Sequence, residues 1–122
     1  MTMAANGRIY TAAVVEKKPF VTIWDRQIWA EEFWAIPKGA RNLDAAKKFI
    51  SFASRPAQMA VQASTIAYGP ARKSAAALAS EEMRPYLPTE KGNFATAIHN
   101  DVEFWADHGD AINERFLVWL NK

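Results

Sequence analysis

Residues 21–37, VTIWDRQIWAEEFWAIP, limit the choice of fold more than any other part of the chain. They place three tryptophans, a phenylalanine and three carboxylates in one short segment. Aromatic side chains of this kind fill a core or line a cleft, and carboxylates beside aromatic faces suit a cleft for an organic cation. A twisted, half-buried hairpin has the same composition. The segment alone therefore leaves core and cleft as open alternatives.

The size and composition predict one modest globular domain. The chain has 122 residues, of which 50% are apolar and 23% charged, which is enough for a core and far from disordered composition. The net charge is only +2 and the basic residues are scattered, so we expect no nucleic-acid partner. The absence of cysteine excludes disulfides, thiolate catalysis and cysteine-bound zinc, and it leaves the compartment open.

The first ten residues, MTMAANGRIY, contain neither a signal peptide nor an apolar run that could cross a bilayer. As written, the chain carries no address for a compartment. The same would hold if Met1 or Met3 were an internal methionine of a longer protein, or an artificial start, and the resemblance described below favours such a truncation.

Local patterns predict an α+β chain that is mainly helical, with a short two-stranded segment followed by several helices. A helix is expected over residues 8–15. Strands are expected at residues 20–24 and 28–36, joined by Asp25-Arg26-Gln27, because both runs are rich in aromatic and β-branched residues. We divide the chain into a region with this helix and these strands (1–37), a helical region (38–86) and a region of C-terminal helices (87–122).

The middle region contains the clearest helical signals. Apolar residues recur at helical spacing over residues 43–53, and Pro56 is well placed to start a second helix. The sequence Tyr68-Gly69-Pro70 should end that helix, with Gly69 in a left-handed cap. A short helix is expected at residues 71–78 and a loop at 88–93. The buried stripe of the second helix should contain Met59, Ala63 and Ile66.

The longest predicted helix covers residues 102–120. Asn100 and Glu103 resemble a capping box at its start, and Gly109 is a position where it could divide. Its apolar face is predicted to contain Trp105, His108, Ile112, Phe116 and Trp119. A histidine in such a stripe is more often a packing residue than a base or a ligand, and we interpret His108 in that way.

The sequence has no pattern typical of an enzyme. It has two histidines, no cysteine, no HExxH motif, no phosphate-binding glycine loop and no Gly-x-Ser-x-Gly elbow. We therefore predict no catalytic residue, no metal and no cofactor.

Binding residues are easier to nominate. On a strand, Glu31 and Glu32 face opposite sides, so at most one of them faces a cleft. Asp25 adds a third carboxylate, and surface solvation is the simplest interpretation of each. Trp24, Trp29 and Trp34 suit either a core or a cleft wall, and we expect core packing for two of the three. Tyr68 is equally suited to a groove or to ordinary packing at a helix end.

Six motifs in order resemble a known family. They are NGRIY at 6–10, VTIWDRQ at 21–27, FWAIPKGARNLDAAKKFISFASRP at 33–56, YGPARKSA at 68–75, LPTEKGN at 87–93 and FWADHGDAINERFLVWL at 104–120. Together they look like the C-terminal third of a periplasmic solute-binding protein of an ABC importer, in the spermidine/putrescine-binding branch. This resemblance covers nearly the whole chain.

The resemblance implies a fold and a set of partners. Proteins of this type have two α/β lobes that enclose the ligand, so the chain corresponds to a fragment of a bilobed periplasmic binding protein. It implies a polyamine or a related small organic cation or amine as ligand, importer membrane subunits as partners, and a periplasmic parent. Apolar faces that meet the other lobe in the family would be uncovered here, and we expect self-association.

The resemblance also implies where the ligand binds. The family's acidic ligand residue falls on Glu32, its tyrosine before Gly-Pro falls on Tyr68, and residues 21–37 lie beside the cleft. An aromatic residue often precedes the acid by two positions, but Ala30 stands there, with Trp29 and Trp34 nearby. The nominated ligand-binding residues are Glu32, Tyr68, Trp29, Trp34 and Asp25. The alternative is a small helical protein–protein interaction module without a ligand.

Overall fold

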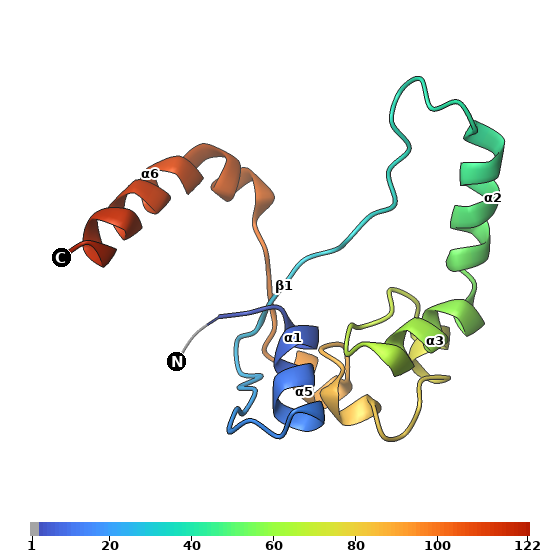
Figure 1. Ribbon diagram of the computed structural model, residues 1–122, viewed down its shortest axis with the longest axis horizontal. Helices are drawn as coiled ribbons and strands as arrows, with labels where there is room; N and C mark the ends of the chain where they lie inside the picture. Colours follow the sequence, from blue (N-terminus) through green and yellow to red (C-terminus); the bar gives the residue numbers. More distant parts are fainter. Residues whose placement is uncertain (1–2) are drawn as a thin grey trace.

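The computed structural model describes residues 3–122, and these form six α-helices, two helical turns of other types and two very short strands (Figure 1). In chain order they are α1 (Asn6–Tyr10), the π-helical turn η1 (Thr11–Val15), β1 (Ile28–Trp29), α2 (Leu43–Ala53), α3 (Pro56–Thr65), α4 (Lys73–Ala76), the 3₁₀ turn η2 (Arg84–Tyr86), α5 (Lys91–Phe94), β2 (Ile98–His99) and α6 (Val102–Leu120). The prediction of a mainly helical chain with a short two-stranded segment is confirmed.

A small core lies where α3 meets the segment that runs from α4 to η2. Its buried side chains are small apart from two, Met83 and Leu87, and Tyr10 of α1 packs against them. Small side chains let backbone segments approach closely, so this part of the chain is dense despite its short helices. We call α1, η1 and residues 56–93 the body. The core cluster consists of Ala63, Ala67, Ala79, Met83 and Leu87.

An amide side chain and a glycine hold the N-terminal helix, α1, against the rest of the body. The side chain of Asn6 donates hydrogen bonds to the carbonyl oxygens of Ala67 and of Tyr86, the latter at 3.1 Å. Gly7 is buried, and a Cβ at that position would press against Ile66 and Tyr68. The prediction of a helix over residues 8–15 is thus confirmed in outline, because α1 and η1 together run from residue 6 to residue 15.

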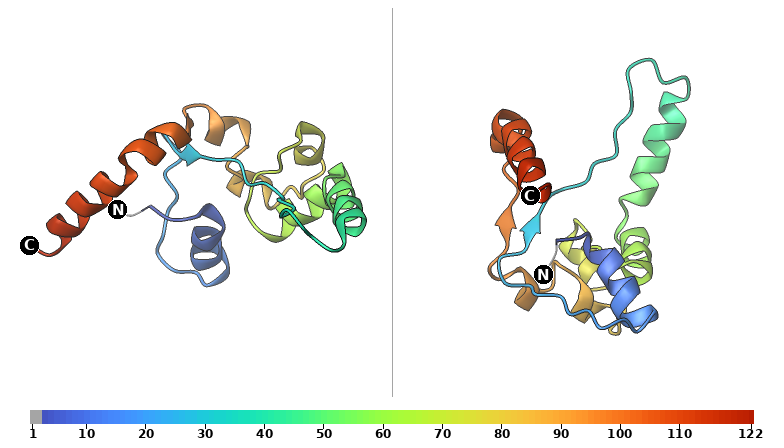
Figure 2. Two further views of the ribbon diagram at one scale, coloured as in Figure 1. Left: turned by 90° about the horizontal axis from the view of Figure 1, so that it is seen from above. Right: turned by 60° about the vertical axis from the view of Figure 1, so that its left-hand side comes forward.

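Two arms project from the body. The first is an extended segment, residues 30–42, that leads to α2, and the second is α6 (Figures 1 and 2). The chain exposes 10228 Å² of surface, whereas a compact monomer of 13.7 kDa exposes about 6,600 Å². The difference reflects the arms, where many large apolar side chains are exposed.

The two strands pair in parallel, and the predicted strand at residues 20–24 is absent. Ile28 lies opposite Ile98, and Trp29 lies opposite His99. Residues 20–24 form no strand, and after Trp29 the chain continues as an extended segment rather than a strand. The aromatic and β-branched pattern correctly indicated extended backbone, but pairing across nearly the whole chain leaves no signal in local sequence.

Several helix boundaries also differ from the predictions. Helix α3 ends at Thr65, ahead of Tyr68-Gly69-Pro70, and Gly69 does not adopt a left-handed conformation. A Cβ on Gly69 would instead overlap the side chain of Thr89, so the glycine permits a close approach. Ile66 consequently lies outside the helix and is exposed, while Ala63 is buried as predicted. The predicted loop at residues 88–93 includes the first turn of α5.

The C-terminal helix is continuous through Gly109, so the predicted division is absent. Its N-cap is Asp101, whose carboxylate accepts a hydrogen bond from the Phe104 N–H at 2.9 Å; Asn100 does not fill this role. The helix buries no residue, and His108 is exposed. The predicted packing role of His108 is therefore wrong, because nothing in the described residues covers this face. None of the helices within residues 3–122 has the length and apolar character to cross a bilayer.

Candidate functional site

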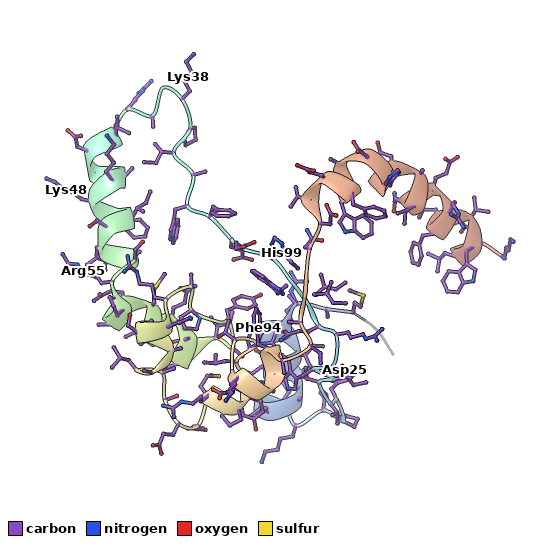
Figure 3. The ribbon with its side chains drawn as sticks, turned by 180° about the vertical axis from the view of Figure 1, so that it is seen from behind. Asp25, Lys38, Lys48, Arg55, Phe94 and His99 are labelled. Carbon is purple, nitrogen blue, oxygen red and sulfur yellow. The ribbon has the colours of Figure 1, made fainter. Side chains whose placement is uncertain are left out.

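The candidate site lies where the chain crosses itself at β1 and β2. We call residues 25–31 and 94–100 the crossing. The N–H of Ile98 donates to the carbonyl of Gln27, and the N–H of Asn100 donates to the carbonyl of Trp29, both at 2.8 Å. These two bonds place the aromatic and acidic segment beside the strand that leads into α6 (Figure 3).

Gln27 connects the crossing to the body. Its side-chain amide donates to the carbonyl oxygens of Pro88 and Asn93, each at 2.8 Å. The amide of Asn93 in turn donates to the carbonyls of Pro85 and Leu87, at 3.0 and 2.9 Å. Two neighbouring amide side chains thus satisfy four carbonyls of residues 85–93. The position of the crossing is fixed by this polar network as well as by the two strands.

Asp25 serves the local structure at one end of the crossing. The hydroxyl of Thr96 donates to its carboxylate, and the same hydroxyl accepts the N–H of Arg26, both at 2.9 Å. Arg26 has a left-handed conformation, with φ of 54°, which costs free energy for a residue with a Cβ and is maintained by these contacts. Asp25 therefore already has a hydrogen-bond partner, although it remains exposed to solvent.

Trp29 lies at the centre of an aromatic and charged cluster. Its ring centroid is 4.4 Å from that of His99 and 5.4 Å from that of Phe94. The Nε2 atom of His99 lies 2.8 Å from a carboxylate oxygen of Glu31. Figure 3 labels His99 and Phe94 on either side of this cluster. Sequence analysis missed the part played by His99 and Phe94, because each meets its partner only through the crossing.

The hydrogen bond from His99 lowers the pKa of the Glu31 carboxyl below its ordinary value of 4.5. Both side chains are about half exposed, so solvent screens the pair. Its role is chiefly geometric, because it connects the segment after β1 to the end of β2. It also gives Glu31, one of the two adjacent glutamates, a histidine partner.

Glu32 and Trp34 lie farther along the extended segment toward α2. Within residues 3–122 the Glu32 carboxylate has no hydrogen-bond or ion-pair partner, and its side chain is exposed. Trp34 packs edge-on against Phe49 of α2, with ring centroids 5.1 Å apart, yet 62% of it stays exposed. A carboxylate and an aromatic ring that packs against Phe49 on one side are therefore both accessible to solvent.

Tyr68 lies elsewhere, against the first helix. It lines a shallow depression together with Ile66, with residues of α1 and η1 such as Arg8, and with Glu16, which directly follows η1. The structure thus distributes the five nominated residues over three places: the crossing holds Asp25 and Trp29, the α2 arm holds Glu32 and Trp34, and the body holds Tyr68. Among residues 3–122 there is no group of three histidine or carboxylate side chains that could hold a metal ion.

Comparison with known proteins gives two matches. The model of the family described as bacterial extracellular solute-binding protein matches residues 1–89. The chain is also 40% identical over 119 residues to the gamma-aminobutyric acid-binding protein of Pseudomonas aeruginosa. That alignment covers 98% of this chain and 34% of the relative, so the chain spans about a third of the relative's length. No solved structure matches significantly.

Proposed function

The chain belongs to the bacterial extracellular solute-binding protein family, and on this basis we propose that it forms part of the solute-binding component of an ABC importer. The observation that carries the proposal is the 40% identity, over nearly the whole chain, to a protein named for binding gamma-aminobutyric acid. A binding role without chemistry also agrees with the residues of the candidate site, which include carboxylates and aromatic rings.

The ligand we propose is a small molecule with a primary ammonium group. An ammonium needs a carboxylate partner, and its aliphatic stem packs well against aromatic faces, each cation and ring contact contributing about 0.5 to 2 kcal/mol. The name of the relative favours an ω-amino acid such as γ-aminobutyrate over a polyamine. Putrescine and spermidine remain the competing ligands that a binding experiment should include.

Glu32 is the carboxylate that we assign to the ammonium. Its neighbour Glu31 already has a partner in His99 at 2.8 Å, and adjacent residues of an extended segment point to opposite sides. The Glu32 carboxylate is exposed, and two positions farther along Trp34 shares its side of the segment. Trp29, Asp25 and Tyr68 are proposed to complete the wall of the site from the crossing and the body.

In this proposal the ligand is bound by non-covalent contacts only, without a chemical reaction. The carboxylate of Glu32 pairs with the ammonium, Trp34 and Trp29 contact the stem, and the occupied component is recognised by the membrane subunits of the importer. Closure of a binding protein around its ligand is a known way to signal occupancy. The chain spans about a third of the relative's length, and we assign its residues to one side of such a site.

Calorimetric titration tests the proposal. The matched third of the Pseudomonas relative would be replaced by this chain, and the chimera and the 122-residue chain titrated with γ-aminobutyrate, putrescine and spermidine. Hydrogen bonds to charged groups contribute about 1.5 to 3 kcal/mol, so Glu32→Gln should weaken binding roughly 10- to 150-fold. The neighbouring Glu31→Gln is the matched control and should change affinity less than about threefold, because Glu31 faces His99.

The outcomes separate the parts of the proposal. Equal affinity of the chimera and its Glu32→Gln variant would remove Glu32 from the site while leaving the family role intact. A chimera that folds but binds none of the three amines would overturn the ligand class. A higher affinity for putrescine than for γ-aminobutyrate would show that the ligand is a polyamine rather than an ω-amino acid.

A further inference from the structure

The residues on the apolar face of α6 are spaced symmetrically about Ile112, and the proposed function does not explain this spacing. The stripe formed by Trp105, His108, Ile112, Phe116 and Trp119 is centred on Ile112. His108 and Phe116 lie four residues to either side of the centre, and the two tryptophans lie seven residues to either side. All five positions share one face of a helix. The stripe therefore reads the same from both ends in its spacing, with tryptophan at each end.

This face has no cover in the described part of the chain. Trp105, Phe116 and Trp119 are 46%, 51% and 65% exposed. The aromatic contacts that α6 makes are all within the helix, between Phe104 and Trp105, Phe104 and His108, and Phe116 and Trp119. Figures 1 and 2 show α6 projecting from the body from every side that they present.

A stripe that is symmetric about its centre is what an isologous helix pair requires. In a dimer with two-fold symmetry, residue i of one copy contacts residue j of the other, and j contacts i. An antiparallel pair centred on Ile112 sets Trp105 against the partner copy's Trp119, and His108 against its Phe116. Spacings of three and four residues also match the knobs-into-holes geometry of paired helices.

The polar face of α6 agrees with a protein partner rather than an anionic membrane. It carries four carboxylates, Glu103, Asp107, Asp110 and Glu114, which lie roughly opposite the stripe. Helix pairing along the stripe leaves these groups in water and away from each other. An anionic lipid surface would repel them, since interfacial helices that bind such membranes are rich in lysine and arginine on the polar face.

The surface that the chain exposes beyond that of a compact monomer is larger than a standard protein interface. The chain exposes 10228 Å², about 3,600 Å² more than a compact monomer of its mass. A standard protein interface buries about 1,600 Å² in total from both partners. The excess is shared between the α2 arm and α6, and burying about 800 Å² on each of two copies would give an interface of this standard size.

We propose that two copies of this chain associate through α6, as an antiparallel helix pair centred on Ile112. Gly109 lies beside the stripe, and a Cβ there would meet nothing closer than Trp105 at 3.8 Å, so the glycine keeps that edge of the helix slim for a second helix. The association goes beyond the proposed binding role and does not depend on a ligand.

Crosslinking at single cysteines tests the arrangement, since the natural chain contains none. With a short bismaleimide, Ile112→Cys should give a covalent dimer, whereas Asp110→Cys on the opposite face should not. Trp105→Cys alone should not crosslink, but a mixture of Trp105→Cys and Trp119→Cys chains should. The last result distinguishes an antiparallel pair from a parallel one.

Sedimentation measures the association itself. The 122-residue chain should be a dimer at micromolar concentration, and Phe116→Ser with Trp119→Ser should raise the dissociation constant more than 100-fold with helical circular dichroism retained. Val61→Ser is the matched control, since Val61 is 67% exposed on α3; it should leave the dimer intact.

A monomeric wild-type chain at all concentrations would overturn the proposal, as would equal crosslinking at positions 110 and 112. Self-crosslinking of Trp105→Cys would replace the antiparallel pair by a parallel one. If the part of the Pseudomonas relative that this chain does not match prevents the Ile112→Cys crosslink, the proposal is overturned, because that part then covers α6.

Discussion

The body and the two arms of this chain treat apolar side chains in opposite ways. Among residues 3–122 the buried hydrophobic side chains belong to five alanines, one methionine and one leucine, all in the body. The arms, by contrast, expose large rings such as Trp34, Phe49 and Trp119. Helices form in both regions, so helical structure does not depend on burial here. The comparison teaches that the small residues complete the body, whereas the large residues of the arms are suited to surfaces that meet another part of a protein.

The largest expected effect contrasts a leucine of the body with one of an arm. Leu87 is 1% exposed at the centre of the core, and Leu120 is 60% exposed at the end of α6. Leu87→Ala should lower the free energy of unfolding by about 2 to 5 kcal/mol, from lost burial and the cavity left behind. Leu120→Ala should change it by less than about 0.5 kcal/mol. Urea unfolding followed by circular dichroism measures both, and equal losses would contradict the distinction between body and arm.

A second contrast concerns two glycines of the body. A Cβ on Gly69 would overlap Thr89, but one on Gly92 meets no atom within 4 Å. Gly69→Ala should therefore cost about 1 to 3 kcal/mol through overpacking, while Gly92→Ala, within α5, should be neutral or stabilise by up to about 1 kcal/mol. Adding Thr89→Ala to Gly69→Ala should recover part of the loss in thermal unfolding. If Thr89→Ala recovers none of the loss, contact with Thr89 is not the cause of the destabilisation by Gly69→Ala.

The helices were the part of the fold that sequence could predict. The spacing of apolar residues and the proline at residue 56 indicated α2 and α3, and α2 begins and ends where predicted. Burial was harder, because a stripe shows which face is apolar and not whether a neighbour covers it. The stripe of α6 was correctly located at Trp105 to Trp119, but no part of it is buried.

The candidate site was predictable in composition only. The segment rich in tryptophan and carboxylate was identified, and Trp29 does lie at the crossing. The partners of Glu31 and Gln27 lie more than sixty residues away in the chain, and no local pattern specifies such contacts. Only two chemical hints were present, an unassigned His99 and the amide side chains of Gln27 and Asn93 in the motifs used for the family resemblance.

The hydrogen bonds of Gln27 should couple the stability of the crossing to that of the body. Gln27 donates two hydrogen bonds to the carbonyls of Pro88 and Asn93. Gln27→Ala should cost about 1 to 2 kcal/mol, since each such bond contributes about 0.5 to 1.5 kcal/mol. Hydrogen exchange of the Ile98 and Asn100 amides should quicken accordingly. Gln62→Ala, at an exposed position on α3, is the control. Unchanged protection in Gln27→Ala would show that the strands hold the crossing unaided.

The smallest expected effect is the acid response of the Glu31 and His99 pair, at the boundary between crossing and arms. The hydrogen bond from His99 lowers the pKa of Glu31 below 4.5, so the ionised carboxylate favours the folded state. A lowered folded-state pKa gives a stabilising contribution that is present above the ordinary value and is lost as the pH falls through the folded-state pKa. Carbon-detected NMR titration should therefore show the Glu31 midpoint rising toward 4.5 in His99→Ala. His108→Ala, an exposed histidine on α6, should leave it unchanged; an equal rise in both variants would assign the effect to net charge rather than to the crossing.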